Sequence, residues 1–302
     1  MVEGICRKFL WTGDTNASKK ALVFWEKMCR PKSKGGLNII DLTTWNRDAL
    51  LKQLWNACMK KDKLWIRWVH VYYIKGKIPW QVEAKQALWI IRKILQAGKY
   101  INKARLDIGK VLGTKSFSIR GMYNQLRGDF PKENWSRLLW NNKGCPRCKF
   151  ILYLVVHEKL YTKDRLSSWG LQVNPNCSLC DQELKGHQHM FFMCRFSAEV
   201  WGKLLAWIGL VRRVTGWNEE LKWTADHRKD KGSKTMMYTM CITSVVYQIW
   251  MERNRRIFQQ EKRSSEAIIR QIIQEIHCIR NGQSSLRNEL QILNLYPYEL
   301  LE

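Results

Sequence analysis

The chain has 302 residues, 45% of them hydrophobic, so it is long and apolar enough to bury a core, which excludes a generally disordered protein. Fifty-two Lys and Arg against 26 Asp and Glu leave a formal charge of +26, which predicts attraction to polyanions, with nucleic acid as the first candidate partner. Ten cysteines in a chain of this length do not suggest a small protein that depends on a framework of disulfides.

The first part of the chain is expected to be helical after an irregular start. Pro31 and the pair Gly35-Gly36 interrupt any helix in the first forty residues, which should form a short apolar turn and a loop. Beyond Thr43, apolar residues recur at helical spacing on both sides of a charged break at 60–63, which predicts two amphipathic helices.

Helical signals continue through the middle of the chain. A helix is expected from about Glu83 to Ala97 with Gly98 as its stop, followed by a basic linker or exposed loop over 98–116. Further helical or apolar segments are expected at Ile119–Leu126, Trp135–Trp140, Phe150–Val156, the start signal at Thr162, and Val200–Ile208 capped by Ser197.

Two more helices are expected in the tail, Met236–Gln260 and Ser265–Arg280, joined by a short polar break that favours an antiparallel pair. The second carries a stripe of isoleucines that needs a partner surface. The apolar stretch from Met236 to Met251 is too short and too polar for a membrane span. Strand signals are sparse, so the fold class is predicted as mainly α, with bundle-like helical segments around a small Cys/His module.

That module lies in CSLCDQELKGHQHMFFMC, residues 177–194. Cys177, Cys180, His189 and Cys194 have the spacing C-x2-C-x8-H-x4-C, and four thiolate or imidazole ligands are what a tetrahedral zinc ion takes. With all four positions filled by protein, the site is predicted to be structural, because a catalytic zinc keeps one position open for water.

Two alternatives remain open for the ligand set. His187 can replace His189, with the spacing C-x2-C-x6-H-x6-C. Alternatively, the second C-x2-C pair, Cys145 and Cys148, can join the first pair in a four-cysteine ribbon, which leaves His189 and Cys194 unused.

The positive charge is concentrated in the first half of the chain. Residues 51–150 hold 22 basic and 5 acidic side chains, a net +17. Such a surface is typical of binding to phosphates with strong salt dependence and little sequence preference. The sequence has no phosphate loop, no nucleophile elbow and no adjacent Asp-Asp pair for two-metal chemistry, so no enzymatic activity is expected. The absence of a signal peptide favours an intracellular protein.

Several segments resemble the reverse transcriptase zinc-binding domain of plant LINE-type non-LTR retrotransposon proteins: FSIRGMYNQL at 117–126, NWSRLLW at 134–140, PRCKFILYLVVHEKLYTKDRLSSWG at 146–170, and CSLC with HMFFMCRFSAEVW up to Trp201. The family's C-x2-C and H-x4-C ligand pairs match Cys177, Cys180, His189 and Cys194. The segment from Lys19 to Trp55 resembles the part of such proteins that follows the polymerase palm.

The resemblance implies three regions: a basic helical post-palm segment at 1–110, the zinc-binding domain at 111–210, and a helical tail at 211–302. It implies a non-catalytic fragment of the polyprotein with a structural zinc ion, which binds RNA or DNA in the nucleus, with other retroelement proteins as further partners and no membrane. The alternatives are a protein-interaction module that docks through its C-terminal helices, and a retroelement relic without a selected function.

Overall fold

The computed structural model describes residues 2–14, 21–59, 62–83, 85–182, 186, 188–227, 232–280, 290 and 293. Within these residues all regular structure is helical and no strand occurs, which confirms the mainly α fold class. The chain divides into two compact units, the first made of the described residues within 1–19, 25–31 and 36–131, the second of those within 20–24, 32–35 and 132–302. No helix among the described residues has the length and apolar character needed to cross a bilayer.

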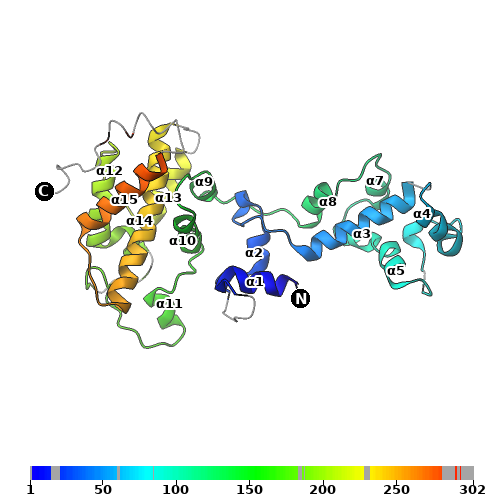
Figure 1. Cartoon of the computed structure of the whole chain (residues 1–302), viewed down its shortest axis with the longest axis horizontal. Coiled ribbons are helices and arrows are strands. Elements are labelled where there is room, and N and C mark those ends of the chain that lie inside the picture. Colours follow the sequence, from blue (N-terminus) through cyan, green and yellow to red (C-terminus); the bar gives the residue numbers. More distant parts are fainter. Residues whose placement is uncertain are drawn as a thin grey trace. The chain divides into compact units, whose positions relative to one another are not determined.

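In the first unit the short helices from α4 to α8 surround one longer helix, α3 (Figure 1). Its elements are α1 (Val2–Thr12), α2 (Trp25–Cys29), α3 (Leu42–Met59), α4 (Leu64–Val69), the π-helical η2 (His70–Ile74), η3 (Pro79–Gln81), α5 (Trp89–Leu95), α6 (Gly98–Lys103), α7 (Ile108–Leu112) and α8 (Ile119–Leu126). The two amphipathic helices expected after Thr43 are therefore present as α3 and α4, and the helix expected at 119–126 is present as α8.

The core of this unit gathers on one side of α3. Leu51, Leu54 and Trp55 are buried there against apolar side chains of α5, α6, α7 and α8, and the Trp55 indole N–H donates to the carbonyl of Thr114 at 2.9 Å. Side-chain caps start two of the short helices: Asp107 accepts from the N–H of Lys110, and Ser118 accepts from the N–H of Gly121.

Three expectations for the first unit are wrong. The first forty residues contain α1 and α2 rather than only turn and loop. Gly98 begins α6 instead of ending a helix. Glycine permits a close approach there, because a Cβ at this position would lie 2.8 Å from Cδ1 of Ile108. Residues 98–116 hold α6 and α7 rather than an exposed linker, since Ile101 and Leu112 are buried in the core.

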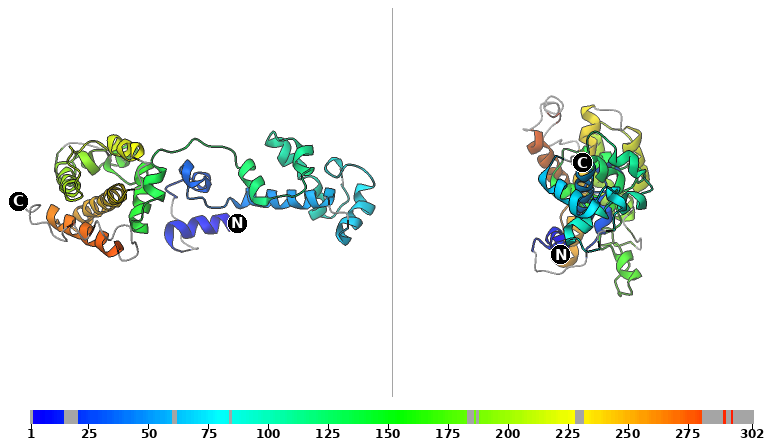
Figure 2. Two further views of the ribbon diagram at one scale, coloured as in Figure 1. Left: turned by 90° about the horizontal axis from the view of Figure 1, so that it is seen from above. Right: turned by 90° about the vertical axis from the view of Figure 1, so that its right-hand side faces the viewer.

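The second unit is a helical assembly around the 26-residue helix α14. Its elements are η1 (Lys32–Lys34), α9 (Ser136–Trp140), α10 (Pro146–Val156), α11 (Lys163–Ser168), the π-helical η4 (His189–Met193), α12 (Arg195–Trp207), α13 (Trp217–Asp226), α14 (Ser233–Phe258) and α15 (Ser265–Arg280). Helices α10, α12 and α15 pack against α14, and Figures 1 and 2 show α12, α14 and α15 side by side.

The isoleucine stripe of α15 is part of this core. Ile268, Ile272 and Ile276 have no exposed surface, and they face α12 and α14 within the same unit. The alternative of a protein-interaction module required this stripe to be exposed for binding another helix. In the structure the stripe is buried within the unit. The tail helices were otherwise placed well from sequence, with α14 and α15 each within three residues of the expected bounds.

Candidate metal centre

The first half of the Cys/His cluster is a tight turn. The N–H of Asp181 donates to the carbonyl of Cys177 at 2.8 Å, and the N–H of Cys177 donates to the carbonyl of Gln182 at 2.9 Å. Asp181 takes a left-handed φ of +58° to close the turn, a conformation that Asp tolerates better than most residues. Within the turn the N–H of Leu179 points at the Cys177 sulfur, 3.5 Å away. The turn thus places the sulfurs of Cys177 and Cys180 on one side.

The second half is a single π turn followed by a helix. The N–H of Cys194 donates to the carbonyl of His189 at 2.7 Å, closing η4, and Cys194 is the N-cap residue of α12. The wide turn brings the imidazole and the thiol to the same place. Ser197, expected to cap α12, instead lies in its first turn, and its hydroxyl donates to the carbonyl of Met190 at 2.6 Å.

The two halves bring four potential ligand atoms together. One atom from each of Cys177, Cys180, His189 and Cys194 lies within 4.8 Å of all the others. The sulfurs of Cys177 and Cys194 are 3.9 Å apart, and Nε2 of His189 is 3.4 Å from the Cys180 sulfur. Zinc–sulfur bonds of ~2.3 Å arranged as a tetrahedron give an edge of about 3.8 Å. The four residues therefore fit a tetrahedral ion.

The cluster is closed and electrostatically suited to a cation. Cys177, His189 and Cys194 are buried, and Cys180 is partly buried. A hydrogen bond from the Cys194 thiol lowers the pKa of Cys177 to about 4, and the same contact together with burial raises the pKa of Cys194. A bound cation would favour the thiolate form of both cysteines.

His189 presents Nε2 to the cluster and turns Nδ1 away from it. Nδ1 is buried and has no hydrogen-bond partner among the described residues. A ligating histidine usually donates its second N–H to an acceptor, so this nitrogen is a position where such a partner is expected.

The structure bears on only one of the two alternative ligand sets. His187 lies outside the described residues. Cys145 is the N-cap residue of α10 and Cys148 is buried in that helix. Among the described residues, the group able to hold a metal does not include this pair.

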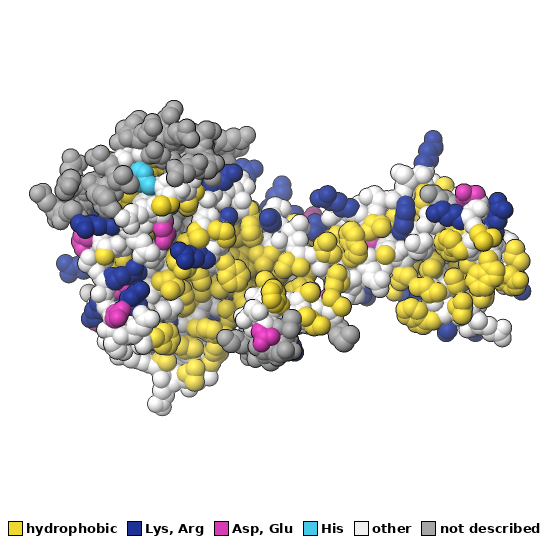
Figure 3. Space-filling model, in the orientation of Figure 1, with side chains coloured by type: hydrophobic (Ala, Val, Ile, Leu, Met, Phe, Trp, Pro, Cys, Tyr) yellow, Lys and Arg dark blue, Asp and Glu magenta, His cyan; other side chains and the backbone are white. Residues whose placement is uncertain are grey.

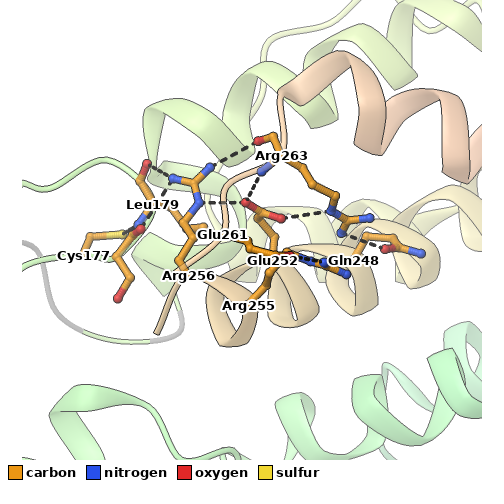
Figure 4. A network of polar contacts seen from close by, with 9 residues as sticks. Cys177, Leu179, Gln248, Glu252, Arg255, Arg256, Glu261 and Arg263 are labelled. Carbon is orange, nitrogen blue, oxygen red and sulfur yellow. Dashed lines mark hydrogen bonds and ion pairs between the residues drawn. The ribbon is translucent and has the colours of Figure 1, made fainter. Parts of the chain in front are cut away.

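Behind the cluster lies a polar network that the sequence did not reveal (Figure 4). Arg256 of α14 donates to the carbonyl of Leu179 at 2.9 Å, while its Nε pairs with Glu252 at 2.8 Å. Glu252 is fully buried and also accepts from the backbone N–H and the guanidinium of Arg263. No local pattern signals this contact, because Arg256 lies 77 residues after Leu179.

Comparison with known proteins identifies part of the chain. Residues 117–201 match the family described as zinc-binding in reverse transcriptase. Over 92 residues the chain is 30% identical to the Putative ribonuclease H protein of Arabidopsis thaliana, a match that spans 30% of this chain and 14% of that relative. No solved structure shows a significant match. The resemblance to the reverse transcriptase zinc-binding domain is thereby confirmed, and its matched segment contains all four residues of the cluster.

Proposed function

We propose that this chain is a non-catalytic fragment of a LINE-type reverse transcriptase polyprotein that binds RNA or DNA. The proposal starts from the match of residues 117–201 to the reverse transcriptase zinc-binding domain. The observation that carries the proposal is the cluster of three thiols and one imidazole inside the matched segment. The chain spans only 14% of the relative it matches, so any ribonuclease activity stated in that relative's name stays with that protein.

In this proposal Cys177, Cys180, His189 and Cys194 hold one structural zinc ion. The buried, closed geometry supports a structural role, because four protein ligands leave no position for a reacting water. Zinc would fix the turn at 177–181 to the start of α12, because Cys177 and Cys180 lie in the turn and Cys194 is the N-cap residue of that helix. The absence of adjacent aspartates in the sequence supports a chain without two-metal chemistry of its own.

The nucleic-acid part of the proposal rests on charge. Residues 51–150 carry a net +17, and on the face in Figure 3 dark-blue basic side chains far outnumber magenta acidic ones. Lys and Arg that neutralise phosphates release counterions, so binding should weaken steeply as salt rises and depend little on sequence. Such partners favour the nucleus as the compartment and other retroelement proteins as neighbours.

Zinc content measured by metal mass spectrometry on the purified chain tests the first part. We expect one zinc per chain, lost in Cys177→Ser and in His189→Ala, and retained in the control Cys145→Ser. Zinc kept in His189→Ala and lost in His187→Ala would move the ligand to His187. Salt-dependent binding of the zinc-loaded chain to labelled RNA and DNA tests the second part, and affinity that survives high salt would count against it.

A further inference from the structure

The second unit contains a groove of about 930 Å³ away from the Cys/His cluster. Lys32 and Ser33 of η1, the segment 132–143 with α9, and the first turns of α14 line it. Two sets of hydrogen bonds join these walls. The N–H of Glu133 donates to the carbonyl of Ser33 at 3.1 Å, and the buried side chain of Asn142 donates to the carbonyl of Thr239 at 2.6 Å. The groove is therefore held by contacts from several elements.

Its lining is strongly basic. Lys32, Lys132, Arg137 and Lys143 are exposed side chains in the groove, against a single acid, Glu133. The Lys32 ammonium lies 4.9 Å from the centre of the Trp140 ring, and this cation–π contact holds the charge against the groove wall. Four cations around one hollow attract a ligand with several negative charges.

The other lining groups suit a phosphodiester chain. Thr235, Met236 and Thr239 belong to the N-terminal turns of α14, the end where the dipole of a helix is positive. Asn134 and Asn141 add amide donors and acceptors. Pockets of roughly 300–1,000 Å³ enclose drug-sized molecules. A short stretch of one strand has that size, whereas a double helix, whose major groove alone is ~12 Å wide, is much broader.

We propose that this groove binds a short stretch of single-stranded nucleic acid through its phosphates, with Lys32, Lys132 and Lys143 as phosphate ligands. The inference rests on the proposed nucleic-acid function, and it adds where the nucleic acid binds and that the bound form is single-stranded. It also assigns a role to the second unit beyond holding zinc.

The test is fluorescence anisotropy of the zinc-loaded full chain with labelled oligothymidylate, over a series of salt concentrations. The groove variant Lys32→Gln/Lys132→Gln/Lys143→Gln is compared with the control Arg213→Gln/Lys262→Gln/Arg270→Gln, which removes the same charge from exposed positions outside the groove. Circular dichroism and zinc content establish that both variants are folded.

Each lost phosphate contact on a single strand removes about 0.7 from the slope of log K against log salt. We expect the groove variant to lose about 2 from the slope and to bind roughly tenfold to a hundredfold more weakly at about 0.1 M salt. The control variant should bind nearly as the wild type does. Equal losses of affinity in the two variants would show that the groove is not the binding site, while the proposal of general nucleic-acid binding would stand.

Two other outcomes would also overturn the inference. If a duplex binds as tightly as the single strand and loses as much affinity in the groove variant, the groove does not select single strands. Equally tight, groove-dependent binding of polyglutamate would assign the groove to acidic protein. A wild-type chain that binds neither strand nor duplex would overturn the nucleic-acid function itself.

Discussion

The Arg256 guanidinium donates a hydrogen bond to the carbonyl oxygen of Leu179, 2.9 Å away, within the turn that joins Cys177 to Cys180. The same guanidinium is held from behind by the buried carboxylate of Glu252. The matched family segment ends at residue 201, so a side chain outside it fixes the backbone of the candidate ligand turn.

Replacing this arginine should loosen the candidate metal centre. We expect Arg256→Ala to lower zinc affinity by about 10–100-fold, because removal of groups that orient a ligand turn has effects of that size. The affinity is measured by competition with a chromophoric chelator.

Arg255→Ala is the matched control for that experiment. Arg255 is the neighbouring arginine on α14, and its ion pair with Glu261 is at the surface, where such pairs contribute little. Equal zinc affinities for the two variants would show that the contact with Leu179 does not support the site.

The buried carboxylate of Glu220 should make Tyr238 important for stability. Burial alone would raise the pKa of Glu220, but hydrogen bonds from Arg212 and Tyr238 outweigh it and lower that pKa. The Tyr238 hydroxyl is 2.6 Å from the carboxylate. Tyr238→Phe should cost about 1–3 kcal/mol in the free energy of unfolding. In urea denaturation, the exposed control Tyr161→Phe should stay within about 0.5 kcal/mol of wild type.

Asp48 should give the chain an unusual pH dependence. Its side chain is fully buried in α3, and neither carboxylate oxygen has a hydrogen-bond partner among the described residues. Burial raises the pKa of Asp48 to about 7, with Arg47 opposing the shift. The folded state therefore holds this proton more tightly than the unfolded state, whose Asp pKa is about 3.9. The associated stability is present below about pH 4 and is lost as pH rises to about 7.

The variant Asp48→Asn isolates this effect. It should remove the decline between those pH values and be more stable than wild type at pH values above about 7, by about 1–3 kcal/mol. Thermal unfolding followed across the pH range measures it. A wild-type curve that matches the variant at every pH would mean that folding does not raise the pKa of Asp48.

The isoleucines of α15 should be required for folding of the second unit. Ile272 has no exposed surface, whereas Ile279 at the end of the same helix is partly exposed. Ile272→Ala should cost about 2–5 kcal/mol through the cavity that it leaves, and Ile279→Ala clearly less. Chemical denaturation compares the two, and similar losses would contradict the assigned packing.

Local sequence patterns were sufficient where an element carries its own signal. Apolar periodicity predicted α3 and α14, which the structure contains. The structure also brings Cys177, Cys180, His189 and Cys194 together, while their role as metal ligands stays a prediction. These signals are local because helical faces repeat every few residues and a zinc knuckle needs its cysteines close in sequence.

The same patterns failed where tertiary contacts decide. Gly98 has the sequence context of a helix stop, yet it begins α6, and Ile108 packs close to it in the folded unit. In the sequence the isoleucine stripe resembles a docking surface, but in the structure α12 and α14 cover it. Arg256 looks like any surface arginine, because nothing near it in sequence marks Leu179 as its acceptor. The division of the chain into three regions stays a prediction.

The separation of Leu179 and Arg256 along the chain also sets a delay between their synthesis during translation. The ligand turn leaves the ribosome 77 residues ahead of the guanidinium that holds it. At ~5–20 residues per second, the nascent chain carries the turn without its arginine for roughly 4–15 s. During that interval the turn at Leu179 lacks its hydrogen bond from Arg256, so an ion taken up by the cysteines and the histidine at that stage would be held without this support.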